Sequence, residues 1–137
     1  MTTNQTFCSA LPRAVAEELG DRAATHHLVT SHMVKLWFGN KALHYECGVY
    51  AHRKVIEIGL HFESDAMTNL RLLGAFRARS SVIARRLPTA RIEPWDKGWV
   101  RVWESIPLAP LAPFAPTFRE RVAKRLAGYI SVLEPIL

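Results

Sequence analysis

The chain has 137 residues, of which 49% are hydrophobic and 22% are charged, a composition typical of one globular domain with its own core. No apolar run approaches the roughly 20 residues that span a bilayer, and the N-terminus lacks the basic and apolar regions of a signal peptide. Two cysteines, Cys8 and Cys47, are too few for a disulfide framework or a cysteine metal site. We therefore expect a single cytoplasmic domain over 1–137, without membrane contact and with residues 1–8 as a frayed tail.

The chain is basic, with a formal net charge of +6 and a pI near 9.8. Such a charge favours nucleic acid or an acidic partner. The basic residues are spread along the chain and form no basic tail, so the charge alone does not establish nucleic-acid binding.

A first helix is predicted over residues 9–20, because apolar residues recur at every fourth position. They are Leu11, Val15 and Leu19. Residues 21–31 fit either more helix or a loop, and the adjacent His26 and His27 in this stretch are typical of a solvated turn.

Three strands are predicted over 32–39, 43–52 and 55–63, because apolar and polar residues alternate along them. With Arg53 and Lys54 as a two-residue turn, the last two strands pair with their like faces together. The expected opposite pairs are Val49 and Ile58, Gly48 and Gly59, Glu46 and His61, and His44 and Glu63.

A long amphipathic helix is predicted over residues 65–87. Its apolar stripe consists of Leu70, Leu73, Phe76, Ile83 and Leu87. The arginines that lie off this stripe are Arg71, Arg79, Arg85 and Arg86.

The segment after this helix is a predicted hairpin with residues 96–98 as a three-residue loop and Gly98 in the left-handed conformation. The expected opposite pairs are Trp95 and Trp99, Glu93 and Arg101, and Arg91 and Trp103.

Proline stands at every third position of residues 107–116, a spacing that matches the three residues per turn of polyproline II. This segment is either a docking ligand for a partner or an extended crossover that packs on its own domain. A last helix follows from about Thr117 to Pro135, with a core stripe of Phe118, Val122, Leu126, Ile130 and Leu133.

The order of these elements predicts an α+β fold with an antiparallel sheet of about five strands and helices packed on one face. The other face then collects a partner- or ligand-binding set: Trp37, Tyr50, Trp95, Trp99, Arg101 and Trp103. Three alternatives remain open for this face. It is covered by the first helix or its neighbour, it forms a homodimer interface, or it binds a small molecule or nucleic acid.

A polar cluster is predicted on the same face, formed by His44, Glu46, His61 and Glu63. Two histidines and a carboxylate are a plausible metal set, but cross-strand charge pairs give the same pattern without a metal. We expect no bound metal and no other cofactor. A pair of Glu46 and His61 can serve as a general base, yet no nucleophile, oxyanion donor or phosphate loop is identifiable, so catalysis is not favoured.

Nucleic-acid binding is an alternative that depends on the arginines of the 65–87 helix. The candidate contacts are Arg71, Arg79, Arg85 and Arg86. The aromatic residues that stack bases in such proteins lie here among glutamates, which repel phosphate.

Two segments, LPRAVAEELG over 11–20 and VRVWESIPLAPLAPF over 100–114, resemble the type III secretion chaperones, small bacterial dimers that bind partner proteins. The order of the elements is also similar. The chain is basic where those chaperones are usually acidic, and IEIGLHFES and EPWDKGW match none of their motifs and look instead like uncharacterised bacterial proteins. No functional residue is carried over from the resemblance.

The sequence therefore favours a non-catalytic, cytosolic protein-binding or chaperone-like module that is homodimeric. Its protein partner is not identified. The alternatives are the nucleic-acid-binding protein and an enzyme or small-ligand binder at the Trp/His/Glu face.

Overall fold

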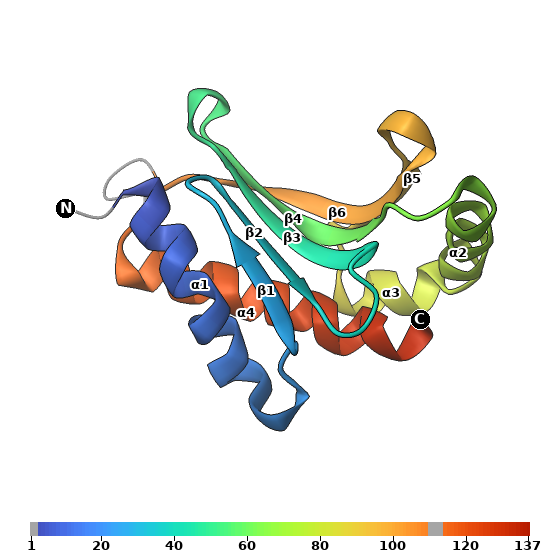
Figure 1. The fold of residues 1–137 in the computed structure, drawn as a ribbon, viewed down its shortest axis with the longest axis horizontal. Helices are drawn as coiled ribbons and strands as arrows, with labels where there is room; N and C mark the ends of the chain where they lie inside the picture. The colour runs from blue at the N-terminus through green and yellow to red at the C-terminus, as the bar shows by residue number, and fades with distance from the viewer. Residues whose placement is uncertain (1–2, 110–113) are drawn as a thin grey trace.

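A computed structural model describes residues 3–109 and 114–137 as one antiparallel sheet with helices against it (Figure 1). The helices are α1 (Asn4–Leu19), α2 (Ala66–Ala78), α3 (Ser80–Arg86) and α4 (Pro116–Leu133). The strands are β1 (His26–Val29), β2 (Met33–Trp37), β3 (Leu43–Tyr50), β4 (Val55–Phe62), β5 (Arg91–Pro94) and β6 (Val100–Pro107), in the spatial order β1-β2-β3-β4-β6-β5. The predicted α+β class is confirmed, with six strands rather than about five.

Helix α1 begins earlier than the sequence indicated. Thr3 caps it, since its hydroxyl accepts a hydrogen bond of 3.2 Å from the backbone of Thr6. Phe7 and Cys8 are fully buried, and Phe7 extends the every-fourth-residue stripe by one turn and packs against Phe114 at 5.5 Å between ring centroids. The predicted frayed tail is therefore wrong for residues 3–8, while residues 1–2 lie outside the described part.

Strand β1 is the element that the sequence left ambiguous. After the turn η1 (Gly20–Arg22), it pairs with β2 so that His26 lies opposite Trp37 and Val29 opposite Val34. Three of its four side chains are exposed. An exposed edge strand shows no alternation of apolar and polar residues, so the two histidines belong to a strand instead of the expected turn.

The hairpin of β3 and β4 has a register that differs from the predicted one by two residues. Its loop spans 51–54, with η2 (Ala51–Arg53) followed by Lys54 at φ 56°. Val49 therefore lies opposite Ile56, and His44 opposite His61. A shift of two preserves the faces of the strands but changes every partner, so the expected pairing of Gly48 with Gly59 is wrong.

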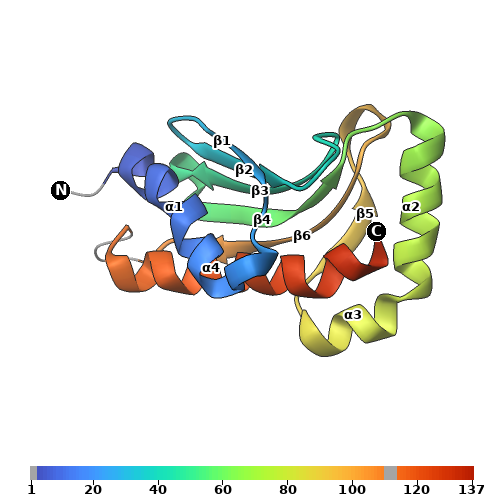
Figure 2. The ribbon, with the colours of Figure 1, turned by 60° about the horizontal axis from the view of Figure 1, so that its bottom comes forward.

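The predicted helix over 65–87 is two helices that run in different directions (Figure 2). Arg79 leaves the helical region at φ −104° and ψ 14°, and Ser80 and Ser81 follow it, residues that favour helix ends. Leu70 is 60% exposed, whereas Asn69 is buried, and its amide is satisfied there because it donates to the carbonyl of Gly98 at 3.0 Å.

The hairpin of β5 and β6 has the predicted register, with Arg91 opposite Trp103 and Glu93 opposite Arg101. Its loop η3 (Asp96–Gly98) holds Gly98 at φ 76°. After β6, Leu108 and Phe114 pack against the chain's own core. This supports the crossover interpretation at both ends of the proline segment, while Leu111 lies outside the described residues.

The core lies between the sheet and the pair α1 and α4, which cover one face (Figure 2). Its interior sheet residues include Tyr45, Cys47, Ile56, Ile58, Leu60 and Phe62. Helix α4 is fastened to β6 where the Tyr129 hydroxyl donates to Glu104 at 2.7 Å. None of the described helices combines the length and hydropathy that crossing a bilayer requires.

Gly59 is the position where a side chain is least tolerable. A Cβ there would collide with the carbonyl oxygen of Val102 and lie 2.7 Å from Cα of Trp103. We expect Gly59→Ala to lower the free energy of unfolding by about 1–3 kcal/mol, because backbone atoms have to move. Gly74→Ala is the control, since nothing lies within 4 Å of its Cβ position on α2; it should stabilise by about 0.5–1 kcal/mol. Urea unfolding measures both, and an unchanged Gly59→Ala variant would contradict this packing.

Candidate functional site

The sheet face opposite α1 and α4, here called the open face, has no described helix over it. The loops 51–54 and 96–98 both rise on this side (Figure 1). Its side chains nevertheless bury one another: Arg101 is 9% exposed, Trp103 7% and His61 4%. The open face is therefore a packed layer of polar and aromatic groups.

Trp103 lies directly opposite Gly59 in the register of β4 and β6, and a Cβ on Gly59 would lie 2.7 Å from its Cα and Cβ. The guanidinium groups of Arg101 and Arg91 lie over its ring, with their Cζ atoms 3.6 and 4.2 Å from the centroid. The indole nitrogen donates to Glu93 at 2.6 Å. The space beside Gly59 is thus filled by the backbone and Cβ of Trp103, whereas Gly48 is covered by the ring of Tyr50.

Arg101 joins the parts of this layer. Its Nη1 donates to Glu57 at 3.2 Å, its Nη2 lies 4.0 Å from Glu93, and its Cζ is 4.5 Å from the centroid of Trp95. A planar guanidinium can stack and pair with carboxylates at once, which a lysine cannot do. These residues, Arg91, Glu93, Trp95, Arg101 and Trp103 with Glu57, are called the Arg–Trp cluster below.

The second group on the open face is the His–Glu cluster, formed by His44, Glu46, His61 and Glu63. The sequence predicted this group, and one ligand atom from each residue lies within 4.8 Å of every other. His44 Nε2 is 3.2 Å from Glu46 and 3.7 Å from Glu63, and His61 contacts the same two carboxylates at 3.8 and 3.3 Å. These four residues can hold a metal ion.

Both carboxyl groups of the His–Glu cluster have a lowered pKa. Burial alone would raise the pKa of Glu46, but the hydrogen bond with His44 and the charges of His61, His44 and Lys35 outweigh it. Burial likewise opposes the hydrogen bond of Glu63 with His61 and the charges around it, and the pKa of Glu63 is also lowered. The carboxyl groups of Glu46 and Glu63 are therefore ionised at neutral pH.

The remaining residues of the predicted face lie at its borders. Trp37 is half-buried at the β1–β2 end, where it stacks on His26 at 5.5 Å between centroids. Tyr50 is half-buried at the end of β3, with the guanidinium of Arg53 4.4 Å from its ring centroid. Trp99 packs against Trp95 at 6.1 Å. The structure thus groups Trp95, Trp99, Arg101 and Trp103, and Tyr50 is joined to them through Arg53 and Glu57, whereas Trp37 packs on His26 at the sheet edge.

The four candidate nucleic-acid contacts are exposed, but they do not lie along one helix. Arg71 is on α2, Arg85 and Arg86 are on α3, and Arg79 is the residue between these helices. The continuous basic helix that this alternative assumed is therefore absent from the described chain.

The sequence missed two contacts of the open face. The Lys41 carbonyl accepts a hydrogen bond of 2.9 Å from His44 Nδ1, and only the loop geometry brings it there. Arg91 was predicted opposite Trp103, but its stacking on that ring was not. Its place at a cross-strand position was the available signal.

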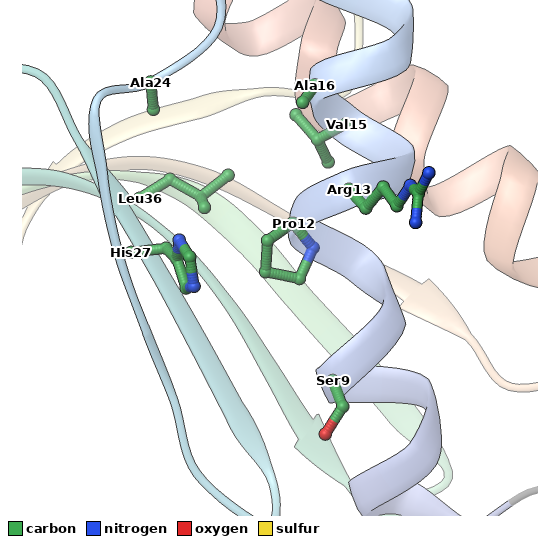
Figure 3. A pocket seen from close by; sticks show the side chains of 8 residues that line it. All are labelled: Ser9, Pro12, Arg13, Val15, Ala16, Ala24, His27 and Leu36. Atoms are coloured by element: carbon green, nitrogen blue, oxygen red, sulfur yellow. The ribbon is translucent and has the colours of Figure 1, made fainter.

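The cavity beside α1 and the two cysteines do not form a further candidate site. A cavity of about 290 Å³ lies between α1 and the strands β1 and β2, where Pro12 faces His27 and Leu36 (Figure 3). Its polar groups do not converge as those of a ligand site do. Burial raises the pKa of the Cys8 thiol to about 11 and that of Cys47 well above its usual value, so neither is an activated nucleophile.

No protein-family model, curated protein or solved structure matches the chain. The functional interpretation therefore depends on the residues of the open face themselves.

Substitution of Arg101 tests whether its stacking and ion pairs stabilise the packed layer of the open face. We expect Arg101→Ala to lower the free energy of unfolding by about 1–3 kcal/mol, because it uncovers Trp103 and removes a buried partner of Glu57. The tryptophan emission should shift to longer wavelength. Arg101→Lys should recover only part of the loss, since it keeps the charge without the stacking plane.

The matched control is Arg85→Ala, at an exposed position of α3, which should change stability by less than about 0.5 kcal/mol. Urea unfolding followed by fluorescence measures all three variants. Full stability of Arg101→Lys would show that charge alone is sufficient at this position.

Proposed function

We propose that the protein is a non-catalytic, cytosolic, chaperone-like binding domain that pairs with a second copy of the chain through the open face. The observation that carries this proposal is the aromatic border of that face. Trp95 is 36% exposed at the side of a layer whose other members are largely buried, and Trp99 beside it is half-buried. Exposed aromatic groups around a packed layer are typical of interaction surfaces.

The residue types and their rigidity support association at this face. Tryptophan, tyrosine and arginine are the residues that carry most binding energy at protein interfaces. Here Arg101 holds Trp95, and Trp95 meets the ring of His61 edge-on at 5.1 Å. Side chains already fixed in the monomer lose little conformational entropy on binding, which favours affinity.

The charge of the open face suits a copy of itself better than a polyanion. Its acidic residues include Glu46, Glu57, Glu63 and Glu93, and its basic residues include Lys35, Arg53, Arg91 and Arg101, with Lys41 and Lys97 over the rings of Trp37 and Trp99. Both signs of charge are present, and an interface with twofold symmetry can place the basic part of one copy on the acidic part of the other. A phosphate backbone would meet four carboxylates.

Trp95 and Trp99 are the tryptophans that we expect to provide the contact. Trp103 is covered within one chain by Arg91 and Arg101, so it needs no partner. Trp95 and Trp99 are the groups whose surface a second copy would cover. The resemblance of residues 11–20 and 100–114 to type III secretion chaperones supports the same proposal, because those proteins are dimers that bind other proteins.

Sedimentation velocity at micromolar concentration tests the pairing. We expect a dimer for the natural chain and weaker association for Trp99→Ala. The helix content by circular dichroism should stay unchanged, because the core lies on the other face of the sheet. Leu70→Ala is the control, since Leu70 is a large exposed apolar residue on α2; it should leave association unchanged. A natural chain that stays monomeric throughout would reject the proposal.

Nucleic-acid binding is the alternative function, and the basic net charge of the chain is the reason to test it. We expect no mobility shift with single- or double-stranded probes beyond a weak effect at low salt. Specific use of the arginines would give an affinity that falls steeply with salt, because each phosphate contact releases counterions. The double variant Arg85→Glu/Arg86→Glu should then abolish binding, and that result would favour the alternative.

A further inference from the structure

The orientation of His44 leaves one of its nitrogens in an unfavourable position if the ring is neutral. Nδ1 lies 2.9 Å from the Lys41 carbonyl, which can only accept, so this nitrogen carries the hydrogen. In a neutral ring Nε2 is then a bare acceptor. It faces carboxylate oxygens of Glu46 at 3.2 Å and Glu63 at 3.7 Å, and acceptors that face one another repel.

His61 has the same difficulty, because both of its nitrogens face carboxylates. Nδ1 lies 3.3 Å from Glu63 and Nε2 lies 3.8 Å from Glu46. A neutral ring has one hydrogen and can satisfy only one of these contacts. With both histidines neutral, the cluster therefore has more acceptors than hydrogens to share among them.

A divalent cation between the four groups removes the conflict. It would balance the two carboxylates and accept a lone pair from each ring, and the two rings lie close enough to share it, with centroids 5.5 Å apart. Lys35, opposite Glu46 in the register, adds positive charge near both carboxylates but cannot ligate a metal while it is protonated.

The cluster also has the surroundings of a metal site. His44 and His61 are 2% and 4% exposed, and Trp95 lies edge-on over His61. A histidine that ligates a metal through one nitrogen usually donates its other N–H to a carbonyl or carboxylate, and the Lys41 carbonyl has that role for His44. This hydrogen bond orients the His44 ring with or without a bound metal ion.

We infer that His44, Glu46, His61 and Glu63 bind one divalent transition-metal ion, with Zn²⁺ the preferred one. Imidazole and carboxylate ligands together suit Zn²⁺ and related ions, whereas Mg²⁺ and Ca²⁺ take oxygen ligands alone. Ligand atoms around a tetrahedral zinc lie about 3.4 Å apart, close to the contacts already present. This inference goes beyond the proposed dimer and departs from the expectation of a metal-free cluster.

The number of ligands also indicates what such a metal does. Four protein groups fill a tetrahedral shell, while catalytic zinc sites keep one position for water or substrate. The site therefore fits a structural or ion-holding role, in agreement with a domain that performs no reaction. Metal binding would join β3 to the end of β4 and stabilise the fold by mass action.

The test is titration calorimetry of the tag-free, chelator-stripped full chain with Zn²⁺ at neutral pH. We expect one Zn²⁺ per chain, a melting temperature that rises with Zn²⁺, and no response to Mg²⁺. Co²⁺ should give the visible absorption of a tetrahedral ion. The variants Glu46→Gln and Glu63→Gln, which keep the side-chain shape, should each weaken Zn²⁺ binding roughly tenfold or more.

The matched control is His26→Ala/His27→Ala, which removes two exposed histidines at the sheet edge and should leave Zn²⁺ affinity unchanged. Absence of stoichiometric uptake by the natural chain would overturn the inference and leave the cluster as cross-strand His–Glu pairs without a metal. Loss of uptake only in the His26/His27 variant would also overturn it, as adventitious surface binding.

A measurement on the natural chain avoids dependence on variants that fold poorly. Histidine side-chain NMR spectra should show Zn²⁺ shifting the Nε2 resonance of His44 and a ring-nitrogen resonance of His61, with the exposed histidines unmoved. The reverse pattern would contradict the site. Because stoichiometry is counted per chain and Trp99→Ala leaves the four ligands intact, failure of the dimer proposal and failure of this inference are distinguishable.

Discussion

The alternation of side chains along strand β4 determines which residues lie in the core and which lie on the open face. The strand lies between β3 and β6, and Ile56, Ile58, Leu60 and Phe62 point into the core, each no more than 1% exposed. The intervening residues must therefore point the other way. This places Gly59 between Glu46 and Trp103, and His61 between His44 and Arg101. The Arg–Trp cluster and the His–Glu cluster are thus neighbours because they share one strand.

The buried side chains of the open face are stabilised by charge pairs and by stacking on aromatic rings, not by an apolar core. Arg101 is buried with Glu57 and Glu93 as partners, and its Nε has no hydrogen-bond partner among the described residues. A buried charge is tolerated only when partners and stacking compensate for lost hydration. The aromatic rings provide the stacking, so the tryptophans and the arginines of this face depend on each other.

The sequence predicted the faces of the sheet well because alternation is a local property. It placed Arg101 and Trp103 on one face with their correct partners on β5, since the loop 96–98 has a short, recognisable form. It misplaced the partners of Gly48 and Gly59, because it predicted a two-residue turn where the loop has four residues, 51–54, and no single residue type indicates that length. It missed β1 and the break at Arg79, where exposed side chains carry no periodic signal.

The two proposals meet at Trp95, which stacks on Arg101 and touches His61. A partner that covers Trp95 would also remove water from the neighbouring His–Glu cluster. Removal of water strengthens the attraction between carboxylates and a cation, and it also raises the cost of leaving those carboxylates without one. Association and metal binding would therefore favour each other, although neither needs the other. The coupling acts through the contact between Trp95 and His61, where the Arg–Trp cluster meets the His–Glu cluster.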